Sequence, residues 1–448
     1  RLLPVPQCST VELAETQRSV EHAAGEVGRI CADVVDRLTS EIKRRSFDVL
    51  PERPRVAVLS VDVAAESLAQ AGRIARALEA LGWPHVCCLP DRPNHCHTAA
   101  RLSAISEIEA DLVLLVNSAA GALGGLLPAE MPVASWYLPG ATIGVDLASR
   151  TGTGNVVFAA SPEAFDALLE FGVANDALHR LDVAGDDTVF APAELGSDER
   201  RRLGCDVAIV SDVPDDRAKA LNISLASQIT LCEAVRTIVA NRADEYTASA
   251  ASEMLESAER ACRTELREAT LREWFLTLIR TTIAPAAIAR NTATTLLRLG
   301  VPLGIWGRNW HGLNADTDPR RGMIPDDAEL NRIYAAARVV LFPLATPRAI
   351  QNAVDARLSG ADVVCREPDA GFAQSYPSLA EAAGTIHFYR DMSGLTRIIT
   401  TLLARAQQNA PETRVVPSEL AGHTTAARLR ELVAVMRARG NPKTASGA

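Results

Sequence analysis

The sequence predicts an α/β protein made of two doubly wound parallel-sheet domains. The chain has 448 residues, which is too long for one ordinary domain and long enough for two that each bury a core. Continuous apolar runs of strand length recur along it and alternate with amphipathic helical stretches. This alternation starts twice, near residue 55 and again near residue 204, so each start marks a separate sheet with its own helices.

The first domain is predicted over residues 55–203, after a helical extension over residues 1–54. Apolar residues at helical spacing between positions 10 and 47 indicate one or two amphipathic helices in this extension. Gly82 is the expected stop signal of the first helix within the domain. Buried strands are predicted at 56–61, 85–89, 111–116, 133–137 and 156–160, and helices at 65–81, 99–108 and 162–171.

The second domain is predicted over residues 204–410. It contains a helical insertion at about 217–298, which we expect to be broken at Pro285 and in the polar segment 241–246. Residues 411–448 are assigned to a C-terminal helix, at 417–438, and a tail. Strands are predicted at 205–211, 303–307, 339–343, 362–365 and 385–389, and helices at 327–337, 348–358 and 376–383.

Composition excludes several classes of function. The net charge is -9 and aromatic residues make up only 4%, so the chain has neither the basic surplus nor the stacking side chains of a nucleic-acid-binding protein. No apolar run reaches the roughly 18 residues of a membrane span. The nine cysteines, an odd and scattered set, indicate reduced thiols and hence a cytoplasmic protein.

Three segments of the second half carry a family resemblance. They are Ile-Trp-Gly-Arg-Asn-Trp at 305–310, Leu-Asn-Arg-Ile-Tyr-Ala-Ala-Ala-Arg-Val-Val-Leu at 330–341 and Asp-Ala-Arg-Leu-Ser-Gly-Ala-Asp-Val-Val at 355–364. In this order they resemble the CgeB-like (spore maturation protein) glycosyltransferases of the glycosyl transferases group 1 family, and segments 157–173 and 181–192 add support. The resemblance covers about a third of the chain. It implies a GT-B fold with two Rossmann-like domains, and transfer of a sugar from a nucleotide-diphosphate sugar without a bound metal or cofactor.

Candidate donor-binding residues follow the strands of the second domain. Ligands of open α/β sheets bind beyond the carboxyl ends of the strands, and arginine supplies a fixed charge and a fork that suits a diphosphate. By resemblance, Asp355 would accept hydrogen bonds from sugar or ribose hydroxyls. The predicted donor-binding residues are Arg217, Gly307, Arg308, Asn309, Thr346, Arg348 and Asp355.

The acceptor is expected on the first domain. A general base for its hydroxyl is sought at strand ends, and Asp62 and Asp146 lie at suitable places. Turn and capping roles are equally common for aspartate. The sequence does not identify the acceptor as a saccharide, a protein or a small molecule.

Two motifs that suggest metal sites are interpreted otherwise. The Asp-Thr-Asp at 316–318 spells the DxD of metal-dependent enzymes, but it lies in a polar loop and not at the end of a strand, so we expect a turn. Cys87 and Cys88, with the His-Cys-His at 95–97, gather soft ligands, but adjacent strand residues point to opposite faces.

Two other functions stay open. The family commonly has an arginine just before the acidic residue that aligns with Asp355, and here residues 351–354 read Gln-Asn-Ala-Val. This departure is compatible with a GT-B protein that has lost catalysis and binds a sugar or a partner. A nucleotide-sugar epimerase on the same fold is the second alternative.

Overall fold

The computed structural model describes residues 10–47, 49–60, 64–89, 98–123, 125–139, 141, 143, 155–217, 221, 223, 225–313, 319–380, 386–408 and 416–440. The chain divides into two compact units. The first comprises Arg1–Ala159, Glu163–Arg180 and Leu429–Ala448, and the second comprises Ala160–Pro162 and Leu181–Arg428.

The first unit contains a six-stranded sheet in which every neighbouring pair is parallel. Its strand order is β2-β1-β3-β4-β5-β6, so the chain reverses its direction of winding between β1 and β3. The strands are β1 (Val56–Ser60), β2 (His85–Cys88), β3 (Leu112–Val116), β4 (Val133–Tyr137), β5 (Asn155–Ala159) and β6 (Leu178–Arg180). The helices are α1 (Thr10–Lys43), α2 (Ala65–Ala80), α3 (Thr98–Glu107), η1 (Ala120–Leu123) and α4 (Pro162–Glu170).

The second unit contains another six-stranded parallel sheet. Its order is β12-β11-β10-β7-β8-β9, so the chain reverses its winding between β7 and β10. The strands are β7 (Val207–Val210), β8 (Leu303–Trp306), β9 (Arg320–Gly322), β10 (Val339–Phe342), β11 (Asp362–Arg366) and β12 (Ile386–Tyr389). Numbered within the unit, this is the order 3-2-1-4-5-6 of dinucleotide-binding sheets.

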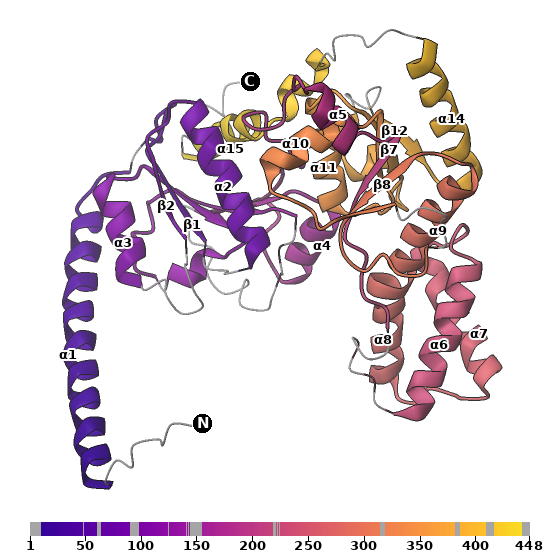
Figure 1. Ribbon diagram of the computed structural model, residues 1–448. Coiled ribbons are helices and arrows are strands. Elements are labelled where there is room, and N and C mark those ends of the chain that lie inside the picture. The colour runs from indigo at the N-terminus through magenta and orange to yellow at the C-terminus, as the bar shows by residue number, and fades with distance from the viewer. Residues whose placement is uncertain are drawn as a thin grey trace, which may run out of the picture. The chain divides into compact units, whose positions relative to one another are not determined.

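Helices cover the second sheet and form the insertion between β7 and β8 (Figure 1). The insertion comprises α6 (Ala226–Asn241), η3 (Ala248–Ala250), α7 (Ala251–Cys262), α8 (Ala269–Leu278), η4 (Ile279–Ile283) and α9 (Ala284–Arg298). The others are α5 (Ser197–Leu203), α10 (Asp327–Ala336), α11 (Pro347–Leu358), α12 (Phe372–Ser375), α13 (Pro377–Ala380), α14 (Met392–Gln408) and η6 (Ser418–His423). The last helix, α15 (Thr425–Gly440), belongs to the first unit from Leu429 onward.

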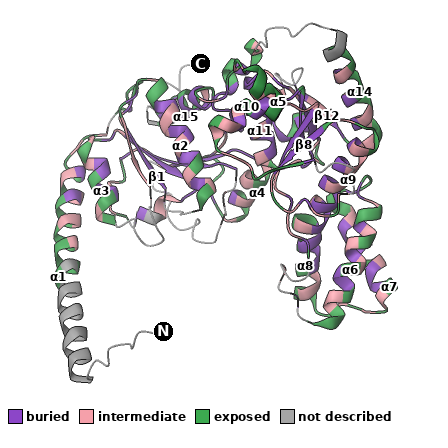
Figure 2. Cartoon of the chain, in the orientation of Figure 1, coloured by how far each residue is buried: buried purple, intermediate pink, exposed green. Residues whose placement is uncertain are grey.

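The cores of both units lie on the strands, which Figure 2 shows as buried. Every residue of β1, β3, β4, β7 and β10 is buried. Helices on both faces of a parallel sheet account for this, because they leave neither face to water. The predicted fold class, two Rossmann-like doubly wound sheets with a helical preface and a helical insertion, is therefore confirmed.

Local structure differs from the prediction in the insertion. Pro285 does not break the helix: α8 runs through a π-helical turn, η4, directly into α9, and Pro285 lies in the first turn of α9. A proline lacks the N–H of the regular ladder, and a wider turn before it accommodates this loss without ending the helix. The predicted break at 241–246 is present, since α6 ends at Asn241.

The unit boundaries also differ from the predicted domain limits. Residues 181–203, predicted in the first domain, group with the second unit. There α5 packs against α10, with Arg332 donating to Glu199 at 3.1 Å. The end of the C-terminal helix groups with the first unit, where Leu432 and Val433 are buried. None of the described helices is long and apolar enough to cross a membrane.

Candidate functional site

The candidate site that the sheet topology indicates lies in the second unit, where β7 and β10 end. The connections from these two neighbouring strands leave in opposite directions, and such a switch point is where open α/β sheets bind their ligands. The chain after β7 is the segment 211–217, and the chain after β10 leads through Thr346 into α11. β8 lies on the other side of β7, and the segment 307–310 follows it.

The segments after β7 and β8 are joined by a clamp of hydrogen bonds. The backbone N–H of Arg308 donates to Asp212 Oδ1 at 2.7 Å, and its guanidinium donates to Asp212 Oδ2 at 2.8 and 3.1 Å. The amide of Asn309 donates to the carbonyl of Val213 at 2.9 Å, and the Trp310 indole donates to the carbonyl of Ser211 at 2.8 Å. Trp310 is buried, so it serves packing here and not stacking on a ligand.

Gly307 makes this clamp possible. Its φ is +138°, a conformation that side chains with a Cβ rarely adopt. A Cβ on Gly307 would lie 2.1 Å from the carbonyl oxygen of Ser211, so only glycine allows the two segments to approach this closely. Asn309 follows in the left-handed region, with φ +65°. The predicted residues Gly307, Arg308 and Asn309 are thus brought together.

The arginines predicted to bind phosphate on this side each face a carboxylate. Arg308 is paired with Asp212, and the Arg217 guanidinium donates to Asp215 at 2.5 and 2.7 Å. The hydrogen bond from Arg217 lowers the pKa of Asp215 to about 2, so this carboxylate is ionised at neutral pH. A phosphate would therefore have to replace, or share, an existing partner of each arginine.

A buried ion triad supports the segment after β7. Asp216 accepts from Arg290 of α9 at 2.9 and 3.0 Å and from Arg236 of α6 at 3.1 Å, and its side chain is 4% exposed. Burial by itself would raise the pKa of Asp216, but the two arginines outweigh it and lower the pKa. Sequence reasoning missed this triad, because its members are far apart in the chain and no local pattern marks them.

The side of the site after β10 is the start of a helix. Thr346 is the N-cap of α11 and its hydroxyl accepts from the amide of Ala349 at 3.1 Å, while Pro347 occupies the first turn. Arg348, half-buried, lies in the same turn. The amides of a first helical turn and the helix dipole both favour an anion. Here the predicted residues Thr346 and Arg348 are together.

Asp355 lies elsewhere on α11. It is fully buried, and its Oδ1 accepts the backbone N–H of Asp186 at 2.9 Å. One turn earlier the amide of Gln351 donates to the carbonyl of Ala184 at 3.2 Å. Both side chains hold the segment 184–186 against the helix. The Asp355 carboxylate therefore faces this segment, whereas the sequence predicts that it faces the donor.

Most of the other residues that the sequence analysis discusses lie outside the part of the chain that the structure describes. The candidate bases Asp62 and Asp146, the Asp-Thr-Asp at 316–318 and the His-Cys-His at 95–97 lie outside the described residues. Cys87 and Cys88 are in β2, and burial raises the pKa of Cys87 to about 11, so its thiol is protonated at neutral pH. Among the residues that the structure describes, no three His, Cys, Asp or Glu side chains are placed to share a metal ion.

Comparisons with known proteins find distant similarity to solved structures. No protein-family model matches the sequence, and no curated protein matches it. A glycosyltransferase from Rickettsia africae is 10% identical, with a TM-score of 0.42 over 88% of this chain and 99% of that chain. HepE from Anabaena, solved with UDP and glucose, is 13% identical, with a TM-score of 0.36 over 88% of this chain and 100% of that chain. MurG from Acinetobacter baumannii is 14% identical, with a TM-score of 0.35 over 85% of this chain and 99% of that chain. At such values the fold assignment rests on the two sheets themselves.

Proposed function

We propose that this chain is a glycosyltransferase of the GT-B class that moves a sugar from a nucleotide-diphosphate sugar to an acceptor. The observation that carries the proposal is the strand order of the second unit. In this order β7 and β10 are paired neighbours whose connections leave in opposite directions. The capped start of α11 follows β10 at this switch point, where an anionic ligand of such a sheet binds. The segments at 305–310, 330–341 and 355–364 support the same class by resemblance.

In this proposal the first turn of α11 holds the donor diphosphate. Its backbone amides and Arg348 supply positive charge, and the Thr346 cap keeps the turn in place. As the bond to the sugar breaks, negative charge grows on the leaving nucleoside diphosphate, so donors aimed at it stabilise the transition state. Because protein groups supply this charge, we propose that the reaction needs no divalent metal.

The clamp between β7 and β8 shapes the other side of the donor site. Arg308 is largely exposed, and we propose that it exchanges Asp212 for a donor phosphate, as Arg217 exchanges Asp215. Gly307 and Asn309 give the backbone its course at this point. We assign Asp355 to holding the segment 184–186 and not to the donor.

The acceptor side rests on the first domain in this proposal. Asp62 or Asp146 would take the proton from the acceptor hydroxyl as it attacks the sugar. The class of acceptor, whether saccharide, protein or small molecule, stays open.

The test is a nucleotide panel on the full chain. We expect one nucleoside diphosphate to raise the melting temperature, and the matching nucleotide sugar to be hydrolysed slowly even with EDTA present. Arg348→Ala should weaken binding of that nucleotide by about tenfold, the usual loss for one charge-assisted contact. Arg298→Ala is the matched control, because Arg298 is an exposed arginine at the end of α9. Equal affinities of the two variants would remove the first turn of α11 from the site.

A second candidate is a GT-B protein that binds a nucleotide sugar without turning it over. The pairing of Arg308 with Asp212 and of Arg217 with Asp215 favours it, because carboxylates beside the diphosphate oppose its binding and the growth of charge on it. Binding without release of the nucleotide in the same panel would select this candidate. An isomerised donor would instead identify a nucleotide-sugar epimerase.

A further inference from the structure

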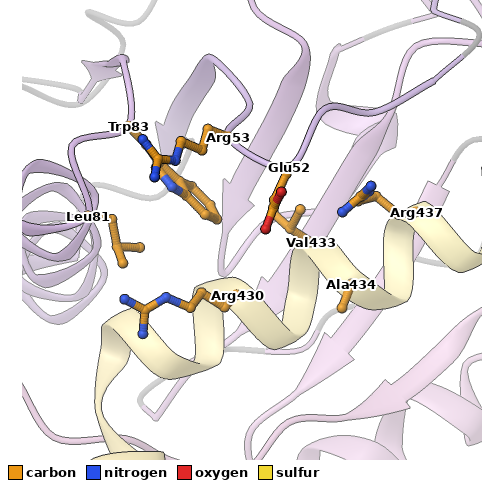
Figure 3. Close-up of a pocket in the computed structure, with 8 residues that line it drawn as sticks. All are labelled: Glu52, Arg53, Leu81, Trp83, Arg430, Val433, Ala434 and Arg437. Atoms are coloured by element: carbon orange, nitrogen blue, oxygen red, sulfur yellow. The ribbon is translucent and has the colours of Figure 1, made fainter.

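The first unit has a pocket of its own at the amino-terminal end of its sheet. Its volume is about 300 Å³, at the lower end of the range for small-molecule sites. It opens beside the residues that precede β1 and β2, whereas ligands of the sheet itself bind at the carboxyl ends of strands. The lining residues, drawn in Figure 3, are Glu52, Arg53, Leu81, Trp83, Arg430, Val433, Ala434 and Arg437.

The end of α2 places the aromatic part of the pocket. Gly82 has φ +65° and reverses the chain after the helix, and its N–H donates to the carbonyl of Glu79 at 2.9 Å. The N–H of Trp83 then donates to the carbonyl of Leu78 at 3.0 Å, which completes a Schellman motif. Trp83 is 6% exposed as a result, so its ring is a fixed part of the pocket wall and not a surface group.

One face of α15 supplies the opposite wall. Arg430, Val433, Ala434 and Arg437 are spaced by three, one and three residues, which aligns them along the helix. Val433 is buried, and the two arginines are exposed. Figure 3 shows Arg430 on the side of Leu81, and Arg437 about two turns further along, on the side of Glu52.

The three arginines of this pocket form no ion pair within the described part of the chain. No hydrogen bond or ion pair joins Arg53, Arg430 or Arg437 to any other described residue. Arg55, two residues beyond Arg53, shows the contrast: its guanidinium donates to Asp111 at 2.9 and 3.1 Å. Among the described residues of the lining Glu52 is the one acidic group, so these residues carry a net charge of +2, from three arginines and one glutamate.

We propose that this pocket binds a small phosphorylated carbohydrate. A phosphate monoester carries a charge of about -1.5 to -2 at neutral pH, which matches the surplus of the lining, and arginine is suited to its geometry. The walls formed by Trp83, Leu81 and Val433 give a carbon skeleton an apolar contact. Glu52 can only accept hydrogen bonds when ionised, so it favours hydroxyl groups and repels a second anionic group.

The test is calorimetry on the full chain with glucose 6-phosphate, inorganic phosphate and glucose. We expect one glucose 6-phosphate per chain, at least tenfold weaker binding of inorganic phosphate, and no binding of glucose. The double variant Arg430→Ala/Arg437→Ala should lower the affinity for glucose 6-phosphate about 100-fold, about tenfold for each arginine. Arg298→Ala and Arg348→Ala, both in the second unit, should leave it unchanged.

A second measurement locates the ligand. Binding should change the intrinsic fluorescence of the protein, and Trp83→Phe should abolish that change while calorimetry still detects binding. No binding of glucose 6-phosphate at millimolar concentration, equal binding of inorganic phosphate, or an unaltered affinity in the double variant would each overturn the proposal. None of these outcomes bears on the transferase proposal, which Arg348→Ala and the nucleotide panel test in the other unit.

Discussion

The arginines beside the switch point of the second unit and those beside the pocket of the first unit differ in their partners. In the second unit Arg308 is paired with Asp212 of the neighbouring segment, Arg217 is paired with Asp215 of its own segment, and Arg290 is paired with buried Asp216. In the first unit Arg430 and Arg437 face a pocket and have no partner among the described residues. An arginine after a strand can thus serve to hold two loops together. Its position relative to the sheet does not by itself identify an anion site, and the presence of a carboxylate partner must be considered as well.

Removing the carboxylate of the buried triad should have the largest effect. Asp216→Asn leaves Arg290 without its ion pair and Arg236 with Glu233 alone. Breaking a buried pair from one side leaves an uncompensated charge, so we expect the free energy of unfolding to fall by about 3 kcal/mol. Urea denaturation measures this fall in the free energy of unfolding. Asp198→Asn is the control, since the Asp198 side chain is 91% exposed, and it should change stability by less than about 0.5 kcal/mol.

The same variant has a pH signature. The pKa of Asp216 is lowered in the folded protein, so its contribution to stability is present above the pKa of the unfolded state, about 3.9, and is lost as the pH falls through the lower folded value. The gap in the free energy of unfolding between wild type and Asp216→Asn should therefore be equal at pH 7 and pH 5, and it should narrow below about pH 4. A gap that widens on acidification would contradict the triad.

Disturbing the close contact between the segments that follow β7 and β8 should give the next largest loss of stability. In Gly307→Ala the new Cβ would meet the carbonyl of Ser211, while the Gly307 N–H is held by the carbonyl of Gly322 at 2.8 Å, so neither segment can shift freely. We expect a loss of about 2 kcal/mol in the free energy of unfolding. Gly312→Ala is the matched control: Gly312 also has a positive φ, +74°, but open space around its Cβ position, and it should lose about 1 kcal/mol. Equal losses in thermal or urea denaturation would mean that the two segments are not in tight contact.

The fold was predictable from the sequence where strands are buried on both faces. The apolar runs at 56–61, 111–116, 133–137 and 339–343 each produced a strand, because such a run has no other stable place in a protein of this size. The short strands β6 and β9 were missed, since three residues carry no periodic pattern. Helix α14 was also missed. Its Ile-Ile-Thr-Thr at 398–401 has strand propensity, which the burial of Leu395, Ile399 and Leu402 overrides.

The candidate site was predictable in position and less so in contacts. Strand ends located Gly307, Arg308, Asn309, Thr346 and Arg348, because residues after parallel strands meet at one edge of a sheet. The pairing of Arg308 with Asp212, and the turn of Asp355 toward the segment 184–186, depend on packing between distant parts of the chain. The pocket of the first unit was missed for the same reason, since it joins the end of α2 to the last helix.

The smallest expected effect decides whether Arg308 is a clamp or a ligand for phosphate. If it exchanges Asp212 for the donor, Arg308→Ala should weaken nucleoside diphosphate binding by about tenfold, and Asp212→Asn, which removes the competing charge, should strengthen it by up to about tenfold. The side chains are 64% exposed in Arg308 and 40% exposed in Asp212, so neither change should alter the melting temperature much. Calorimetry with the nucleotide selected by the panel measures both affinities. Weakening in both variants would mean that the pair acts as one structural unit: the loop, and not the Arg308 guanidinium, would then form this side of the site.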